Sequence, residues 1–206
     1  MILGKQKLRE AVHSGEIKIL DDRGNVDPLW AGIVGADFCL PSNLDPVSLQ
    51  PASIDLHLGD EWRVPKPNAS GGDFFAPPHC DSHQPVEYTT TKSPEIVIPA
   101  HGFLLARTRE VIELPKYLAA KIDGRSSFGR LGVFVQNAGF IDPGFRGSVT
   151  LELFNGLPHP VKLYAGDRVC QIVVTRVEGS TEGGYKGRYQ GQIAATGTKF
   201  HETAGE

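Results

Sequence analysis

The residues best suited to binding an anion lie between positions 124 and 132, which read Gly-Arg-Ser-Ser-Phe-Gly-Arg-Leu-Gly. Small residues let backbone N–H groups approach an anion, the hydroxyls of Ser126 and Ser127 add donors, and Arg125 and Arg130 offer charge-assisted hydrogen bonds. The segment lacks the GxxxxGK[ST] spacing of a Walker loop. It is therefore either a phosphate-binding loop of another kind or a surface turn with two solvated arginines, and the segment alone favours neither.

A candidate site carboxylate follows this segment. Residues 135–145 read as a strand that runs into a turn, with Asp142 directly before Pro143 and Gly144. Asp-Pro-Gly by itself indicates only a turn. An exposed turn does not need the Asn-Ala-Gly of residues 137–139 or a phenylalanine on each side. These neighbours make Asp142 a candidate for a binding or catalytic role.

A second carboxylate, Glu152, lies in the middle of a strand-like segment, residues 148–155. Strand alternation places Val149, Leu151 and Leu153 on one face, so Thr150 and Glu152 share the other. That second face is either solvated or part of a site. A carboxylate in a partly desolvated site is a competent general base, which contributes roughly 10² to 10⁴ in rate.

Histidines and cysteines form no recognisable metal-binding pattern. None of the seven histidines belongs to an HxE, HExxH or HxH motif, and the HxE and PCxxC signature of zinc cytidine deaminases is absent. The three cysteines are isolated, and Cys170 lies in an apolar run where a small buried hydrophobe is expected. If this chain deaminates a base, it must activate water with a carboxylate and without zinc.

The elements that position these residues are predicted to be mostly strands. Residues 4–14 form the best helix candidate, because Leu8, Ala11 and Val12 recur at helical spacing. Strand-like segments occupy residues 54–58, 95–98, 103–107, 148–155, 161–163 and 169–177. Many short strands with one short N-terminal helix indicate a mostly β fold, an antiparallel barrel or jelly roll rather than a βαβ sheet.

The first of these strands has its own expected pattern. Ile54, Leu56 and Leu58 point to one side of the strand, and Asp55 and His57 point to the other. The pattern predicts one apolar face against the core and one polar face.

The length and composition limit the number of domains and the kinds of partner that the chain can have. At 206 residues the chain suits one domain, with loop insertions expected at 21–48 and 65–90 and a flexible, Gly-rich C-terminal arm expected at 179–206. The near balance of 21 Lys and Arg against 24 Asp and Glu argues against a general nucleic-acid binder. No apolar run approaches the ~18 residues of a membrane span. We expect a soluble, cytoplasmic protein.

Together these segments resemble the superfamily of trimeric dUTPases and dCTP deaminases, and most nearly the bifunctional, dUMP-forming dCTP deaminases. The matching segments are residues 50–59, 124–132, 136–147, 150–155, 168–172 and 185–192. The resemblance spans nearly the whole chain apart from the two insertions, and the order and spacing of the segments make it specific.

The resemblance implies a distorted, dUTPase-like jelly roll that forms a homotrimer with active sites between subunits. It also implies that the substrates are dCTP and dUTP, that Mg²⁺ is carried on the triphosphate, and that dTTP can act as a feedback ligand. The implied nucleotide-binding residues are Arg125, Ser126, Ser127, Gln136, Asp142, Thr150, Gln171, Tyr185, Arg188 and Gln192. The implied catalytic residues are Glu152, Asp142, Ser126, Ala138 and Arg130.

The implied roles divide the chemistry between the two carboxylates. Asp142 would meet the deoxyribose 3′-hydroxyl and orient the water that attacks phosphorus. Glu152 would shuttle protons for the attack of water on C4 of cytosine, with the Ala138 carbonyl and the Ser126 hydroxyl positioning that water. The arm, with Tyr185, Arg188 and Gln192, would close over the nucleotide.

Two departures from the family pattern bear on the activity. Arg188 stands where the family's arm is expected to carry a lysine, which keeps the charge and changes the geometry. Residues 137–140 lack the Ala-His-Arg pattern of deaminases that stop at dUTP. The main expectation is therefore conversion of dCTP to dUMP; the alternatives are a deaminase that stops at dUTP, a plain dUTPase, or a non-catalytic nucleotide sensor on the same fold.

Overall fold

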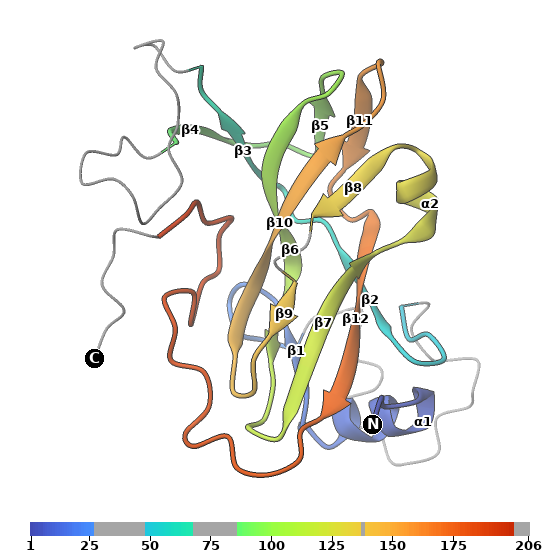
Figure 1. Ribbon diagram of the computed structural model, residues 1–206, viewed down its shortest axis with the longest axis vertical. Helices are drawn as coiled ribbons and strands as arrows, with labels where there is room; N and C mark the ends of the chain where they lie inside the picture. Colours follow the sequence, from blue (N-terminus) through green and yellow to red (C-terminus); the bar gives the residue numbers. More distant parts are fainter. Residues whose placement is uncertain (27–47, 68–85, 137–138, 200–206) are drawn as a thin grey trace.

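The computed structural model describes residues 1–26, 48–67, 86–136 and 139–199, and strands dominate them (Figure 1). Within these ranges the elements are α1 (Lys5–His13), β1 (Lys18–Leu20), β2 (Ile54–His57), β3 (Glu61–Pro65), β4 (Tyr88–Lys92), β5 (Glu95–Ile98), β6 (Phe103–Glu113), β7 (Leu118–Gly124), α2 (Ser126–Arg130), β8 (Val133–Gln136), β9 (Phe140–Ile141), β10 (Arg146–Asn155), β11 (Val161–Tyr164) and β12 (Arg168–Arg176). The predicted mostly β architecture with a short N-terminal helix is confirmed.

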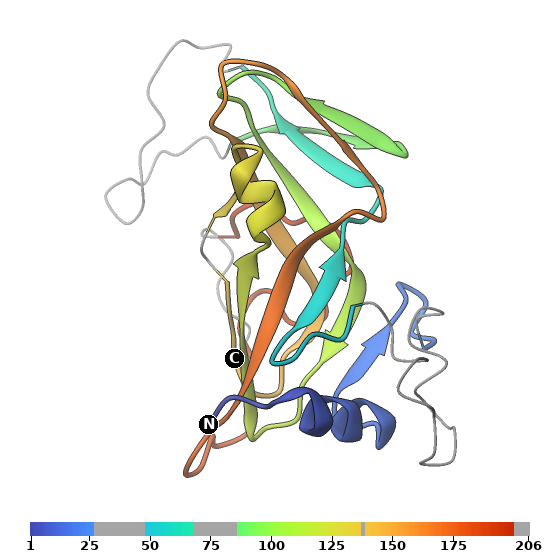
Figure 2. The same cartoon turned by 90° about the vertical axis from the view of Figure 1, so that its right-hand side faces the viewer.

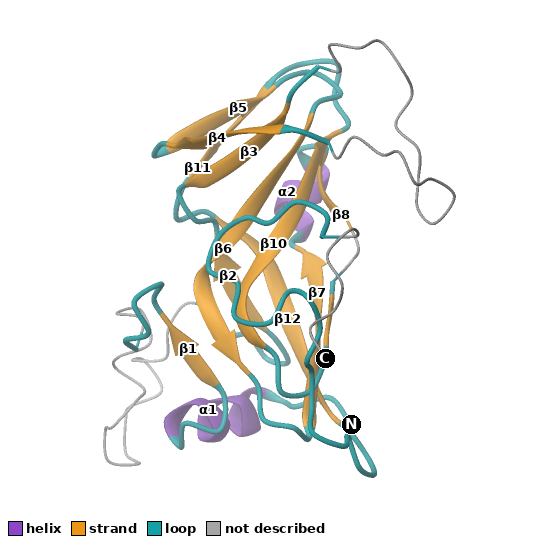
Figure 3. Ribbon diagram, turned by 90° about the vertical axis from the view of Figure 1, so that its left-hand side faces the viewer, coloured by secondary structure: helices purple, strands orange, loops and turns teal. Residues whose placement is uncertain are grey.

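The described strands pair antiparallel in three sheets. One sheet has the order β4-β3-β6-β10-β8, with β1 also pairing with β6; a second has the order β2-β12-β7-β9; β11 and β5 form a third. Apolar side chains from the two larger sheets meet in one buried cluster that includes Ile54, Leu104, Leu153 and Ile172. Figures 2 and 3 show α1 at one end of the long strands, while β3, β4, β5 and β11 gather at the other end.

Helix α1 forms where its apolar spacing predicts it. Leu8, Ala11 and Val12 are buried, and charged residues occupy the remaining faces. The helix ends at Ser14, whose backbone N–H donates to the Glu10 carbonyl before Gly15 turns the chain with a φ of 75°. No described helix is long and apolar enough to cross a membrane.

Strand β10 carries the expected alternation from Thr150 to Leu153, but Val149, expected on the buried face, is only partly buried and lines the cleft, while Ser148 is buried. Leu151 and Leu153 are buried in the core, and Thr150 and Glu152 lie partly buried on the opposite face. The pairing of β10 with β6 changes register between Ser148 and Thr150. At this break the hydroxyl of buried Thr108 accepts the Val149 N–H at 2.9 Å, which replaces a bond of the regular ladder.

Strand β2 differs from its prediction, because both of its faces are buried. Asp55 is 1% exposed and His57 is 7% exposed, although the alternation assigns them to a polar face. The carboxylate of buried Glu110 accepts hydrogen bonds from the ring and the backbone N–H of His57. Charged side chains pair with Asp55 and His57 and cover this second face. The strand therefore alternates polar and apolar residues although both of its faces are buried.

The predicted insertions lie partly outside the described residues, at 27–47 and 68–85. The segment predicted as an insertion at 65–90 has regular structure at its described ends. Pro65 ends β3, Tyr88 begins β4, and the two residues pair with each other. At the start of the 21–48 segment, the Asp21 carboxylate accepts the backbone N–H groups of Arg23 and Asn25 and closes a turn.

Candidate functional site

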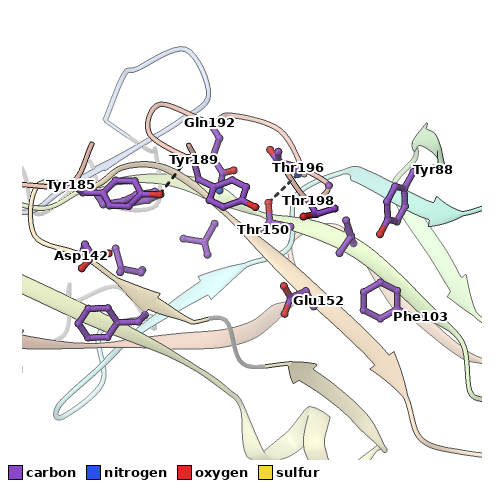
Figure 4. Close-up of a pocket in the computed structure, with 16 residues that line it drawn as sticks. Tyr88, Phe103, Asp142, Thr150, Glu152, Tyr185, Tyr189, Gln192, Thr196 and Thr198 are labelled. Atoms are coloured by element: carbon purple, nitrogen blue, oxygen red, sulfur yellow. Dashed lines mark hydrogen bonds between the residues drawn. The ribbon is translucent and has the colours of Figure 1, made fainter. Parts of the chain in front are cut away.

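A cleft of about 430 Å³ opens beside β10, between the turn that follows β9 and the C-terminal arm. This volume falls within the range of small-molecule sites, roughly 300–1,000 Å³. Its lining residues, drawn in Figure 4, are Tyr88, Phe103, Leu105, Phe140, Ile141, Asp142, Phe145, Val149, Thr150, Glu152, Tyr185, Tyr189, Gln192, Thr196, Gly197 and Thr198. The cleft combines aromatic surface with two carboxylates and several hydroxyls, a composition suited to a polar ring compound.

Glu152 lies on the central part of the sheet that forms the floor of the cleft. In the strand register it stands directly opposite Leu105 of β6 on one side and Gln136 of β8 on the other. Pairing on both sides fixes the backbone of β10 at this point. A carboxylate held on such a rigid element can transfer protons at one fixed position.

Asp142 reaches the cleft from the turn between β9 and β10. The Phe145 N–H donates to the Asp142 carbonyl at 3.1 Å, and Gly144 turns the chain with a φ of 82°, which favours glycine. Figure 4 shows the carboxylates of Asp142 and Glu152 at separate positions along the cleft. The cleft therefore offers two places where a carboxylate can orient a water molecule.

The C-terminal arm, defined here as residues 179–199, covers the cleft of its own chain. Tyr185 packs against Phe145 with ring centroids 5.8 Å apart, and its N–H donates to the Pro143 carbonyl at 2.7 Å. The Gln192 carbonyl accepts the Ser148 N–H at 2.8 Å. Gly147 permits this approach, because a Cβ there would lie 2.8 Å from the Gln192 carbonyl oxygen.

The far part of the arm reaches the polar residues of β10 and β3. The Thr196 N–H donates to the Thr150 hydroxyl at 3.0 Å, a contact visible in Figure 4. The Ala195 N–H donates to the carboxylate of buried Glu61 at 3.1 Å. The arm thus closes the cleft with backbone groups as well as with side chains.

Arg125 and Gln171 lie in a different group, around the buried carboxylate of Asp55. Arg125 Nε and Arg168 Nη1 lie 3.2 Å and 3.3 Å from Asp55 Oδ2. The Gln171 side-chain oxygen accepts the Ser53 hydroxyl at 2.9 Å. Burial raises the pKa of Asp55, and the positive charges of Arg125, then Arg168, oppose that increase.

Replacing Asp55 with alanine is expected to destabilise the fold by about 3 kcal/mol, the low end of the cost of breaking a buried ion pair, because both arginines retain some contact with solvent. Urea denaturation of Asp55→Ala against the parent protein measures this change. Asp123→Ala is a matched control, since its side chain is 43% exposed. If both variants lower the free energy of unfolding by the same small amount, the ion pairs of Asp55 do not stabilise the fold more than an exposed carboxylate does.

The segment at 124–132, expected as a loop, contains the short helix α2. Its first residues, Ser126 and Ser127, and its last residue, Arg130, are exposed. Arg188 of the arm is also exposed and does not line the cleft. These side chains do not line the cleft of their own chain, and their exposure leaves them within reach of a ligand or a second subunit.

The predicted site residues therefore do not all line one cleft of a single chain. The cleft brings together Asp142, Thr150, Glu152, Tyr185 and Gln192, whereas Arg125, Ser126, Ser127, Arg130, Gln171 and Arg188 lie elsewhere. Ala138 lies outside the described residues, and Gln136 is described only in its backbone.

Several cleft residues were missed by the sequence analysis, namely Tyr88, Phe103, Tyr189, Thr196 and Thr198. Tyr88 stands at the edge of a segment interpreted as an insertion, and nothing in its neighbourhood marks it. Thr196 and Thr198 lie just beyond residues 185–192, the part of the arm that resembles the family. The sequence would have indicated them only if the substrate-covering part of the arm had been extended past Gln192.

The described residues contain no group of three or more His, Cys, Asp or Glu side chains that could hold a metal ion. Cys170 is fully buried, as predicted, and burial raises the pKa of its thiol.

Comparison with known proteins identifies the family. A protein from Persephonella marina named dCTP deaminase, dUMP-forming, is 38% identical over 200 residues, which cover 97% of this chain and 97% of that protein. A protein of the same name from Aquifex aeolicus is 34% identical over 201 residues, 98% of this chain and 96% of that protein.

The fold also matches a solved structure. The crystal structure of a 2′-deoxycytidine 5′-triphosphate deaminase from Agrobacterium tumefaciens aligns with a TM-score of 0.52 and 22% identity, over 85% of this chain and 47% of that chain. At this identity the likeness concerns the fold alone, and it confirms the predicted fold class. Residues 31–177 match the family model described as dCTP deaminase-like. The chain belongs to the dCTP deaminase-like family.

Proposed function

We propose that this protein converts dCTP to dUMP by deaminating the base without zinc and hydrolysing the triphosphate, with release of ammonia and diphosphate. The observation that carries the proposal is one cleft with two carboxylates, Glu152 and Asp142, at separate positions. The two full-length relatives described above carry the name of this activity, dCTP deaminase, dUMP-forming.

Glu152 is assigned to the base. It takes a proton from the water that attacks C4 of cytosine and returns protons as ammonia leaves. Its position on a rigid central strand suits this role, because proton transfer requires heavy atoms within hydrogen-bond reach, roughly 2.6–3.2 Å. Thr150 lies on the same face of β10 and contributes a hydroxyl to the nucleotide.

Asp142 is assigned to the sugar and the phosphates. It accepts the deoxyribose 3′-hydroxyl and orients the water that attacks phosphorus. Tyr185 and Gln192 cover the nucleotide from the arm. Mg²⁺ accompanies the triphosphate as part of the substrate; this ion commonly binds through substrate phosphates with few protein ligands.

We further propose a homotrimer in which one subunit completes the cleft of the next. Two observations support it: the predicted phosphate residues Arg125 to Arg130 do not line the cleft, and large apolar side chains are exposed at the end of α2, on β8 and on β9. Leu131, Phe134 and Phe140 are 56%, 46% and 66% exposed in the single chain. Large apolar side chains left exposed in a single chain are typical of surfaces that contact another subunit.

Incubating the pure protein with dCTP and Mg²⁺, and separately with dUTP and Mg²⁺, tests the function through the products. The proposal expects ammonia, diphosphate and dUMP from dCTP. Accumulation of dUTP without diphosphate would instead identify a deaminase that stops at dUTP. Diphosphate from dUTP without ammonia from dCTP would identify a dUTPase, and tight nucleotide binding without any product would identify a sensor.

A further inference from the structure

A tyrosine lies close to Glu152 at one end of the cleft. Tyr88 begins β4 and is partly buried, and Figure 4 shows it beside Phe103 on the Glu152 side, away from Asp142. The arm passes over its ring, because a Cβ at Gly197 would lie 3.5 Å from Tyr88 Cε2. The ring is thus held between the sheet and the arm.

The strand register explains how Tyr88 comes to this place. Arg63 of β3 pairs with Leu105 of β6, and Leu105 pairs with Glu152 of β10, so these side chains project from one face of the sheet. On β4, Thr90 pairs with Arg63, and Tyr88 lies two residues away on the same face. Arg63, Tyr88 and Glu152 therefore lie on one face of the sheet, and Tyr88 and Glu152 both line the cleft.

The charges around the hydroxyl determine what it can donate to. Burial and then the negative charge of Glu152 raise the pKa of Tyr88, whereas the positive charge of Arg63 lowers it. The net direction is upward, so Tyr88 is a neutral phenol at neutral pH. A cation on the Arg63 side attracts the phenol oxygen, and an anion on the Glu152 side attracts its hydrogen. The hydroxyl therefore keeps its hydrogen and can donate it to an acceptor in the cleft that it lines together with Glu152.

We propose that Tyr88 is a catalytic hydrogen-bond donor of the deamination step, directed at the oxygen that water adds to C4 of the pyrimidine. This inference rests on the proposed function and adds a residue to it. The 4-amino group of cytosine is itself a donor and gives Tyr88 little to bind in the ground state. The added oxygen is an acceptor, so the hydrogen bond strengthens as the reaction proceeds, which is the condition for lowering the barrier.

The step balances without any further reactant. Water forms a C–O bond at C4 while Glu152 takes its proton and delivers it to N3. The proton of the new hydroxyl then passes through Glu152 to the amino nitrogen, the C4–N bond breaks, and ammonia leaves with C4=O in place. Tyr88 donates to the oxygen throughout and keeps its own proton.

Tyr88→Phe tests the assignment, because it removes the hydroxyl and keeps the ring that packs against the arm. We expect kcat for ammonia release from dCTP to fall roughly 10- to 100-fold, the order of cost of losing one hydrogen bond to an acceptor that gains negative charge. The kcat for diphosphate release from dUTP should stay within about two-fold of the parent value, since that step reacts at phosphorus. Tyr164→Phe is the matched control, because Tyr164 is 49% exposed on β11 and does not line the cleft.

The outcomes separate this inference from the proposed function. A parent enzyme that releases ammonia, with a Tyr88→Phe variant that releases it equally fast, would overturn the role of Tyr88 alone. Equal loss of ammonia and diphosphate release in the variant would also overturn it, since the hydroxyl would then serve nucleotide binding or folding. A parent protein that releases no ammonia from dCTP would remove the proposed function and this inference together.

Discussion

Glu152→Gln is expected to lower ammonia release from dCTP roughly 10²- to 10⁴-fold, the usual contribution of a general acid–base group. The amide keeps the size of the side chain and cannot accept the proton of the attacking water. Hydrolysis of dUTP to dUMP should continue at nearly the parent rate, because that water is assigned to Asp142. Parallel assays of ammonia from dCTP and of diphosphate from dUTP, both at saturating nucleotide, measure the two effects.

Glu178→Gln is the control for this prediction, since Glu178 is exposed just beyond β12 and away from the cleft. It should leave both reactions unchanged. If Glu152→Gln lowers both reactions equally, the carboxylate serves the nucleotide as a whole and the division of roles is wrong.

Asp142→Asn should have the reciprocal effect. Diphosphate release from dUTP is expected to fall by roughly 10²-fold or more, because the neutral amide no longer orients the attacking water as a base. Ammonia release from dCTP should persist, so dUTP accumulates when dCTP is the substrate. Chromatography of the nucleotides over a time course detects that accumulation directly.

Asp142 is also assigned to the sugar, so its replacement can weaken nucleotide binding. The variant and the parent enzyme are therefore compared at saturating nucleotide, where weaker binding does not lower kcat. Asp123→Asn on β7 provides a control with an exposed carboxylate. Loss of ammonia release in Asp142→Asn, to the same degree as loss of diphosphate release, would contradict the separation of the two waters.

The parts of the fold that the sequence predicted well are those governed by local periodicity. Helical spacing located α1, and strand alternation placed Glu152 on the face opposite Leu151 and Leu153. Cys170 was expected in the core because its whole neighbourhood is apolar, and it is fully buried. Each of these features depends on residues only a few positions apart.

The parts that could not be predicted depend on partners distant in sequence. The alternation assigned Asp55 to the polar side of its strand, but it cannot show that Arg125 and Arg168, which are distant in the sequence, cover that side. The position of Tyr88 depends on the pairing of β3 with β4 and β6. The sequence could not show that Glu152 lines the cleft and Arg125 does not, because both residues belong to the segments that resemble the family.

The register break in β10 has a mechanical consequence. The hydrogen bonds described between the arm and the backbone of β10 lie at Arg146 and Ser148, before the break, whereas Glu152 lies after it. Beyond the break, the described hydrogen bond from the arm reaches the Thr150 side chain and not the strand backbone. Displacement of the arm would therefore strain the backbone of the first part of the strand, and the irregular pairing around Val149 can absorb that strain. The arm can therefore open and close over the substrate in each turnover while Glu152 stays paired with Leu105 and Gln136.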